Sequence, residues 1–470
     1  MATTEFVWNV SDTPAGALLP RPVAYRPSGG DCPDLAKGVR LVAGGAKAKR
    51  AASFLKAGLS AAGVKVGAAG VPVTLDVGHE APGDSDEGYW LSITPTSVTI
   101  RARGAAGLFY GAVTLLQLIP EGGPCRLVPA EVEDYPTLSL RGISVDFRYA
   151  WLTESQVRAT IDKAAAVKAN CIVWWLQDKF VWKSHPNLVH ARALTPKQWK
   201  ALVKYADDRF IQMVPYVDIY GHGENYLDRW GYFPMSNGEM GYWRHDDVQY
   251  CASDPRSMKL IRQLFTECLP VFNNTKFAHV GLDEVDTREK NLCVKCAKRV
   301  ASIGKKLKEA APFTNARNRL IAERFMEIHP WLAKRGRRAM FWDDSATSIT
   351  CRMMGDGGWE LVPEDVVPFV WFYDANTEPV RVVLSRPYAA RHEVVVSPSC
   401  RNLDNIRGLV GLTADFKNVI GVIVTLWELD VFRIEERWEG FGMACALGWN
   451  RDAPAGELMA ALKRRFRKVD

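Results

Sequence analysis

Two adjacent carboxylates, Asp283 and Glu284, close a short apolar run and are followed at once by the charged residues 286–290. This pattern predicts a strand that ends in a loop. Side chains alternate along a strand, so Asp283 shares one face with His279 and Gly281. Glu284 takes the other face, and both acids meet one ligand only where the pleat breaks down at the strand's carboxyl end. A bare Asp-Glu pair usually begins a solvated loop, but the residues in register with this pair favour acid–base chemistry.

Short apolar segments alternate with helical stretches from residue 138 onward, which is typical of a parallel sheet. Eight of these segments predict strands: 142–147, 171–176, 212–217, 278–282, 338–342, 368–372, 393–397 and 420–426. Eight parallel strands in a stretch of this length predict an α/β fold, a (β/α)8 TIM barrel with loop insertions, over residues 136–470. The carboxyl ends of the strands carry the catalytic groups of such a barrel, which is where Asp283 and Glu284 fall.

Residues 1–135 predict a small α/β domain in front of the barrel. Its expected elements are a helix over 46–62, a strand over 71–75, two strands over 89–95 and 97–102 joined by a tight turn, and a helix over 104–118. Residues 120–136 are rich in glycine and proline and are the expected linker.

The motif His279-x-Gly281-x-Asp283-Glu284-Val285 resembles the signature of glycoside hydrolase family 20, the β-N-acetylhexosaminidases. The resemblance implies that Glu284 is the general acid that protonates the departing oxygen and then the base that activates water. It implies that Asp283 accepts the N–H of the sugar's 2-acetamido group, whose own carbonyl oxygen is the nucleophile. It implies neither a metal nor an organic cofactor. The N-terminal hairpin and helix also resemble the family's N-terminal domain, which supports the barrel.

An arginine opens the first predicted barrel strand, in the sequence Leu140-Arg141-Gly142. It resembles the family's opening Arg-Gly motif, which implies that Arg141 binds hydroxyls of the terminal sugar. A guanidinium donates two parallel hydrogen bonds and suits neighbouring hydroxyls. The alternative is a structural ion pair of Arg141 with Asp146 or Glu133.

Asp178 and His222 follow the second and third predicted strands. Asp178 resembles the aspartate of the family's His-Trp-His-Leu-x-Asp pattern, although Val173 and Trp175 replace the two histidines. His222 resembles the histidine that ends the family's Pro-Glu-x-Asp-x-Pro-Gly-His pattern. The resemblance implies that Asp178 and His222 form a relay that orients and tunes the acid Glu284.

Later predicted strands end in tryptophans, namely Trp342, Trp371 and Trp427. All three resemble family positions whose indoles wall the sugar pocket, since aromatic faces pack against the C–H faces of a pyranose. Glu428 directly follows the last of them, where the family has Trp-x-Glu.

The seventh predicted strand departs from the family's Tyr-x-Asp pattern. Asp404 is retained and is expected to bind a sugar hydroxyl, but Asn402 stands where the family has tyrosine. In the family that phenol donates to the acetamido carbonyl oxygen. Either Asn402 takes over the donation through its NH2 group, or Tyr373 reaches in from the neighbouring strand.

Composition places the chain among ordinary globular proteins, with 470 residues, 47% hydrophobic and 24% charged. No apolar run approaches the roughly 20 residues that span a bilayer. A net charge of +7 without a basic face or a known nucleic-acid module indicates no nucleic-acid partner. Residues 1–7 carry no basic or apolar signal region, so we expect either a cytoplasmic chain or an exported one whose signal peptide is absent from this sequence.

The ten cysteines are scattered, and several, such as Cys171 and Cys445, lie inside apolar runs. They indicate buried thiols of a reducing compartment rather than a disulfide framework. Cys293-x-x-Cys296 is half of a zinc site. Because no second such pair and no His-x-x-x-His completes it, incidental cysteines without a metal are the favoured interpretation.

The expected function is therefore an exo-acting, retaining β-N-acetylhexosaminidase that releases terminal GlcNAc or GalNAc from glycans by substrate-assisted catalysis. One alternative is a divergent glycosidase of the same fold that accepts another terminal sugar. The other is a glycan-binding protein without turnover. The choice between GlcNAc and GalNAc, the preferred linkage and aglycone, and the oligomeric state are not encoded in these motifs.

Overall fold

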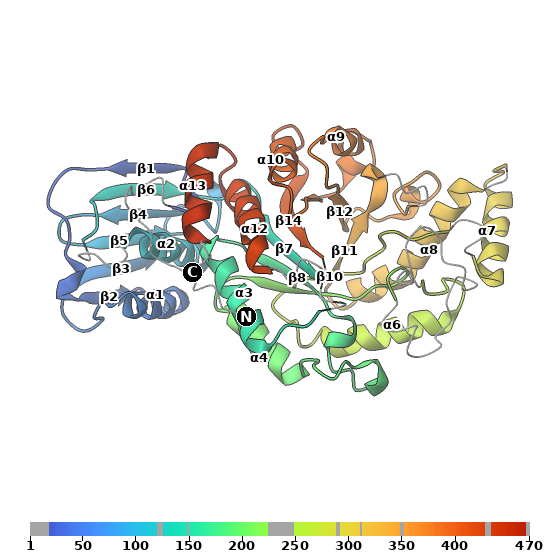
Figure 1. The fold of residues 1–470 in the computed structure, drawn as a ribbon, viewed down its shortest axis with the longest axis horizontal. Coiled ribbons are helices and arrows are strands. Elements are labelled where there is room, and N and C mark those ends of the chain that lie inside the picture. Colours follow the sequence, from blue (N-terminus) through green and yellow to red (C-terminus); the bar gives the residue numbers. More distant parts are fainter. Residues whose placement is uncertain are drawn as a thin grey trace.

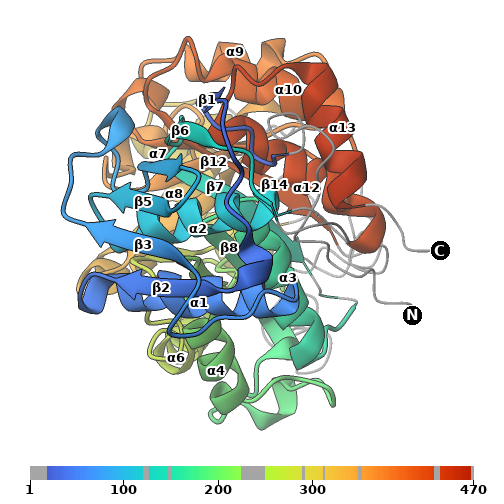
Figure 2. The same cartoon turned by 90° about the vertical axis from the view of Figure 1, so that its left-hand side faces the viewer.

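The computed structural model describes residues 18–119, 126–146, 148, 150–223, 249–287, 292–310, 313–347, 352–427 and 434–466. A mixed-sheet domain built from the N-terminal residues lies beside a barrel built from the rest (Figure 1). Seen from the side of the sheet, the blue strands lie in front of the barrel (Figure 2).

The N-terminal sheet has six strands in the order β1-β6-β4-β5-β3-β2. Their bounds are β1 Ala24–Pro27, β2 Val39–Ala43, β3 Val71–Val77, β4 Tyr89–Ile93, β5 Val98–Ala102 and β6 Ala130–Asp134. Helices α1 (Lys49–Ala61) and α2 (Ala105–Leu118) pack together beside it. All residues of α2 from Gly107 onward are buried, because the helix also contacts the barrel through Tyr110, whose ring lies 5.0 Å from that of Trp449.

Strand β6 lies within the segment expected to be a linker. Its alternating residues Ala130, Val132 and Asp134 are buried, and the strand pairs antiparallel with β1 and β4. The period-two pattern of a half-buried strand thus prevails over the local glycine and proline content. The linker prediction is wrong for these residues.

Eight parallel strands close into the barrel, in the order β7-β8-β9-β10-β11-β12-β13-β14. Their bounds are β7 Leu140–Asp146, β8 Cys171–Trp175, β9 Gln212–Tyr216, β10 Phe277–His279, β11 Arg338–Asp343, β12 Val367–Trp371, β13 Val394–Ser397 and β14 Val419–Leu426. Nearly every strand residue is buried, because helices cover the outside and side chains fill the inside. The predicted TIM barrel and its eight strands are confirmed.

Helices connect the strands and surround the barrel (Figure 1). They are α3 Glu154–Ala166, α4 Pro196–Asp207, α6 Pro255–Cys268, α7 Val294–Lys306, α8 Thr314–Ala333, α9 Glu378–Leu384, α10 Leu403–Leu412, α12 Ile434–Trp449 and α13 Ala455–Arg465. Capping boxes begin α3 and α4, where Thr153 pairs with Gln156 and Thr195 with Gln198. Within the ranges given above, no helix has both the length and the hydropathy that a bilayer crossing requires.

Two ion pairs with buried cations join the N-terminal domain to the amino-terminal end of the barrel. Glu87 accepts from Arg141 at 2.7 Å, and Asp134 accepts from Lys168 at 2.6 Å. Trp449 Nε1 donates to the other oxygen of Asp134 at 2.8 Å. Both cations are fully buried, and the carboxylates of Glu87 and Asp134 offset the free-energy cost of burying their charges.

Candidate active site

The backbone leaves the extended conformation directly after β10, which ends at His279. Gly281, Leu282 and Glu284 have φ of 71°, 81° and 52°, in the left-handed region that L-residues rarely adopt. Any other residue at position 281 would force a shift, since a Cβ there would lie 2.1 Å from Asp218 Oδ1. This break in the pleat lets neighbouring acids turn toward one partner, as the sequence predicted.

His222 is that shared partner. Its Nε2 lies 3.2 Å from Asp283 Oδ2 and 3.6 Å from Glu284 Oε2. It follows β9 in a left-handed backbone conformation with φ of 46°. Both His222 and Asp283 are buried, whereas the Glu284 side chain remains 26% exposed. The arrangement leaves Glu284 as the acid that is most accessible to an incoming substrate.

Arg148, just beyond the carboxyl end of β7, holds the other side of His222. Its Nη1 lies 2.9 Å from His222 Nδ1, and its Nε and Nη2 each lie 3.0 Å from Asp146 Oδ2. A guanidinium only donates, so Nδ1 accepts and the hydrogen of the imidazole is on Nε2, facing the two carboxylates. The guanidinium also lies over the Trp175 ring, 4.0 Å from its centroid.

The surroundings of Asp283 keep its side chain ionised. Burial alone would raise its pKa, but the hydrogen bond from His222 Nε2 and the charge of Arg148 lower it, and the net pKa lies below the ordinary value. The hydroxyl of Tyr216 lies 3.4 Å from Asp283 Oδ1 and receives Trp342 Nε1 at 3.2 Å. Asp283 is therefore an ionised hydrogen-bond acceptor at neutral pH.

Asp344, at the end of β11, is a third acid of the group. Its Oδ2 accepts from the backbone N–H of Glu284 at 2.8 Å, and its Oδ1 accepts from Trp371 Nε1 at 2.8 Å. Burial and the nearby charges of Asp283 and Glu284 raise its pKa well above the ordinary value. Asp344 thus fixes the left-handed turn at Glu284 and ties it to one of the aromatic side chains.

Five aromatic rings from four strand ends gather above the barrel core. Trp342 is buried, with its ring 5.6 Å from that of Trp427, while Trp371 and Trp427 are part exposed. Trp175 lies 6.3 Å from Trp427, and Tyr373 lies 5.1 Å from Trp371. The three predicted tryptophans are brought to the same end of the barrel as the acids.

Tyr373 and Asn402 play different parts in the structure. The Tyr373 hydroxyl accepts from Trp427 Nε1 at 2.9 Å. Burial, with the charges of Asp283 and Glu284, raises the pKa of Tyr373 well above its ordinary value, although hydrogen bonds partly oppose this. Asn402 instead caps α10, with Oδ1 accepting from Asn405 N at 3.1 Å and Nδ2 donating to the Tyr373 carbonyl at 2.9 Å. Both ends of its amide contact backbone atoms, and which of the two side chains donates to the acetamido oxygen stays a prediction.

Arg141 lies at the wrong end of the barrel to bind a sugar. It is near the start of β7, fully buried, and besides Glu87 its guanidinium donates to the carbonyls of Leu138 at 2.6 Å and Lys168 at 3.1 Å. The role predicted for it from the Arg-Gly motif is therefore wrong. The structural ion pair was the correct alternative, although its partner is Glu87.

The remaining predicted residues have less defined surroundings. The Asp178 carboxylate is buried and pairs with Lys179, so its relay with His222 stays a prediction. Asp404 is exposed in the first turn of α10, and its contact with a sugar hydroxyl also stays a prediction. Glu428 lies outside the described residues.

Sequence reasoning missed Arg148 and Asp344 as members of the group. Both had a signal, because each stands just past the carboxyl end of a predicted strand, in the sequences Asp146-Phe147-Arg148 and Trp342-Asp343-Asp344.

Comparison with protein families accounts for most of the chain. The model of the glycosyl hydrolase family 20 catalytic domain matches residues 138–408, and the model of domain 2 of that family matches residues 15–135.

Two curated relatives carry hexosaminidase names. A β-N-acetylhexosaminidase from Cellulomonas fimi is 31% identical over 310 residues, which are 59% of this chain and 61% of that protein. A β-hexosaminidase from Porphyromonas gingivalis is 27% identical over 316 residues, 59% of this chain and 39% of that protein. The alignments span less than two thirds of either relative.

Solved structures share the fold. The family 20 β-N-acetylhexosaminidase of Streptomyces coelicolor aligns with a TM-score of 0.74 at 19% identity, over 97% of each chain. A chitobiase of Flavobacterium johnsoniae aligns with a TM-score of 0.74 at 19% identity, over 96% of this chain and 72% of that one. Since the catalytic-domain model covers more than half of the sequence, this chain belongs to glycosyl hydrolase family 20.

Proposed function

We propose that this chain is an exo-acting, retaining β-N-acetylhexosaminidase that removes a terminal GlcNAc or GalNAc from a glycan. The observation that carries the proposal is the pair Asp283 and Glu284 on the shared Nε2 of His222, at the carboxyl end of the barrel and among indoles. A hexosamine offers this group both an amide to orient and an oxygen to protonate.

In the first step the two acids have separate tasks. Asp283, ionised, accepts the N–H of the 2-acetamido group, while the Tyr373 hydroxyl donates to the carbonyl oxygen of the same group. That oxygen attacks the anomeric carbon as the glycosidic bond breaks, and the departing oxygen takes the proton of Glu284. The product is an oxazolinium ion, whose positive charge the Asp283 carboxylate stabilises.

In the second step Glu284 takes a proton from water, and the water oxygen bonds to the anomeric carbon. The oxazolinium ring opens, the acetamido group is restored, and the configuration of the anomeric carbon is retained after two inversions. Side-chain exposure supports this assignment, because the proton must reach both a leaving group and a water, and Glu284 is more exposed than buried Asp283. His222 and Arg148 position the carboxylates.

The decisive experiment compares Glu284→Gln and Asp283→Asn on aryl 2-acetamido-β-glycosides and on plain aryl β-glycosides. We expect Glu284→Gln to lower kcat by about 100-fold to 10,000-fold with little change in binding. We expect Asp283→Asn to harm the 2-acetamido substrates far more than the plain ones. A thiazoline mimic of the intermediate should inhibit the wild-type enzyme strongly.

The outcomes separate the alternatives. Faster turnover of plain glycosides than of 2-acetamido glycosides would select a divergent glycosidase. Glycan binding without hydrolysis, unchanged in Glu284→Gln, would select a binding protein.

A further inference from the structure

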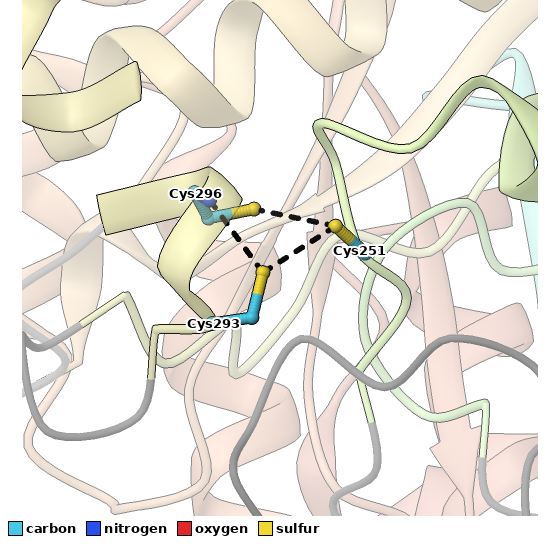
Figure 3. A group of neighbouring side chains, drawn as sticks. All are labelled: Cys251, Cys293 and Cys296. Carbon is cyan, nitrogen blue, oxygen red and sulfur yellow. Dashed lines mark hydrogen bonds between the residues drawn. The ribbon is translucent and has the colours of Figure 1, made fainter. Parts of the chain in front are cut away.

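Three thiols meet from the two segments that follow strands β9 and β10 (Figure 3). Cys293 and Cys296 begin α7, and Cys251 lies in the segment that precedes α6. Cys251 Sγ is 3.5 Å from Cys293 Sγ and 3.7 Å from Cys296 Sγ, and all three sulfurs lie within 4.8 Å of one another. The sequence showed half of a zinc site, and Cys251 adds a third ligand from 42 residues upstream of Cys293.

The spacing of the sulfurs matches a thiolate-bound metal. Zinc binds thiolates at about 2.3 Å in a tetrahedron, which puts neighbouring sulfurs about 3.8 Å apart. A disulfide requires about 2.05 Å between sulfurs, so these thiols are not bonded to one another. Their separation is that of a triangle of ligands around one ion.

The local backbone supports such a site. Cys293 caps α7, and its sulfur accepts the backbone N–H of Cys296 at 3.5 Å. A helix N-terminus favours an anionic sulfur, and N–H donation to a ligand sulfur is the kind of outer contact that orients metal ligands. Ser253 Oγ lies 3.3 Å from Cys296 Sγ and adds a polar contact on the opposite side.

The third ligand is held firmly by buried contacts. The carbonyl of Cys251 accepts from Ser257 Oγ at 2.9 Å, and Ser257 Oγ in turn receives Nη2 of the buried Arg324 at 2.9 Å. The preceding residue, Tyr250, donates its N–H to the carbonyl of Tyr220 at 2.8 Å. Cys251 is therefore connected to the segment that leads into His222.

We propose that Cys251, Cys293 and Cys296 bind one zinc ion as thiolates, with a solvent oxygen as the fourth ligand, and that this ion fastens the start of α7 to the segment before α6. Binding exchanges the protons of the thiols for zinc–sulfur bonds, releases those protons to solvent and needs no oxidant. The ion fixes the far end of the loop that carries Asp283 and Glu284, relative to the segment next to His222. It has a structural role and takes no part in hydrolysis.

The first test is the metal content of the whole chain, purified without chelator or nickel resin from a zinc-supplemented culture. We expect about one zinc per chain in the wild type. Cys251→Ser and Cys293→Ser should lose most of the zinc, whereas Cys32→Ser, which removes an exposed cysteine, should retain it. Zinc removal by a chelator should lower the Tm of the wild type, and added zinc should restore it.

The second test does not depend on whether the variants fold. Wild-type chain freed of zinc and loaded with Co²⁺ should show sulfur-to-cobalt charge-transfer bands and the visible bands of a tetrahedral site. Added zinc should remove these bands and protect three thiols from a thiol reagent.

Several results would overturn the proposal: no zinc after reconstitution, zinc retained by Cys251→Ser, cobalt spectra without thiolate bands, or a Cys251 disulfide to Cys293 or Cys296 in chain produced under reducing conditions. None of these readouts depends on hydrolysis, so they do not bear on the proposed enzymatic activity.

Discussion

Replacing Tyr373 by phenylalanine tests which side chain holds the acetamido oxygen. The substitution removes one oxygen and keeps the ring, which lies 5.1 Å from Trp371 and 6.4 Å from Trp427. The phenolic oxygen accepts from Trp427 Nε1 at 2.9 Å, and the Thr425 side chain is a second hydrogen-bond partner that holds the hydroxyl in place. The variant therefore removes a positioned donor without disturbing the surrounding aromatic packing.

The expected fall in kcat follows from the position of the Tyr373 hydroxyl next to the acetamido oxygen of the substrate. A fixed donor holds the attacking oxygen in line with the anomeric carbon, and loss of that alignment costs about 100-fold in rate, or about 3 kcal/mol. Loss of the phenol also leaves the Trp427 N–H without that acceptor, which costs about 1–3 kcal/mol of stability. We expect kcat on an aryl 2-acetamido-β-glucoside to fall by the first factor while the protein stays folded.

The assay is steady-state kinetics with a thermal unfolding scan on the same preparations. The matched control is Asn402→Ser, because serine keeps the cap of α10 but removes the NH2 group. Its kcat should stay close to that of the wild type. A Tyr373→Phe enzyme with nearly unchanged kcat, beside an Asn402→Ser enzyme that has lost its turnover, would refute the assignment and identify Asn402 as the donor.

Three further predictions concern stability. Arg141→Met should destabilise the protein by about 1.5–3 kcal/mol, because Glu87, whose side chain is 19% exposed, loses a charge-assisted hydrogen bond, and KM should not change. A large rise in KM without unfolding would restore the sugar-binding role. Burial lowers the pKa of His279 from 6.5 to about 3, so the unfolded chain binds the proton first and stability falls as pH drops below 6.5, by about 2 kcal/mol at pH 5. Denaturant titrations at both pH values should show this loss in the wild type and a smaller one in His279→Gln. Gly281→Ala should lower the free energy of unfolding by at least about 1–3 kcal/mol, because of the left-handed φ and the close approach of Asp218. Gly29→Ala should be tolerated, because a Cβ there would meet no atom within 4 Å. Equal unfolding midpoints for the two variants would contradict the steric argument.

The barrel was predictable because each of its strands is a buried apolar run, bounded by polar loops, and buried parallel strands leave that pattern in any sequence. The acidic pair was predictable for a related reason, since a strand end is visible where the run stops at Asp283. Strand β6 was missed because two glutamates alternate with Ala130, Val132 and Asp134, and because the strand follows a glycine- and proline-rich stretch.

The error at Arg141 came from a motif that was given more weight than position. Arg141 and Arg148 flank the same strand, and only the second lies at its carboxyl end. The rule that catalytic groups lie at that end would have selected Arg148. A motif match identifies the strand, but the direction of the chain decides which of its ends meets the substrate.

Contacts between segments that are far apart in the sequence cannot be predicted from the spacing of residues within one segment. Nothing near Cys251 in the sequence marks it as a neighbour of the Cys-x-x-Cys pair, because the loops after two adjacent strands bring them together. The role of Asn402 as the N-cap of helix α10 was likewise not evident from the Tyr-x-Asp comparison.

The ion pairs under the barrel have a consequence for how such proteins can be rearranged. In a barrel separated from the N-terminal sheet, Arg141 and Lys168 would each lose the carboxylate with which they pair. Any domain grafted in place of the sheet would have to supply two carboxylates at the positions of Glu87 and Asp134. We therefore expect that the sheet domain and the barrel have to be kept together, and that other domains can be exchanged only around this pair.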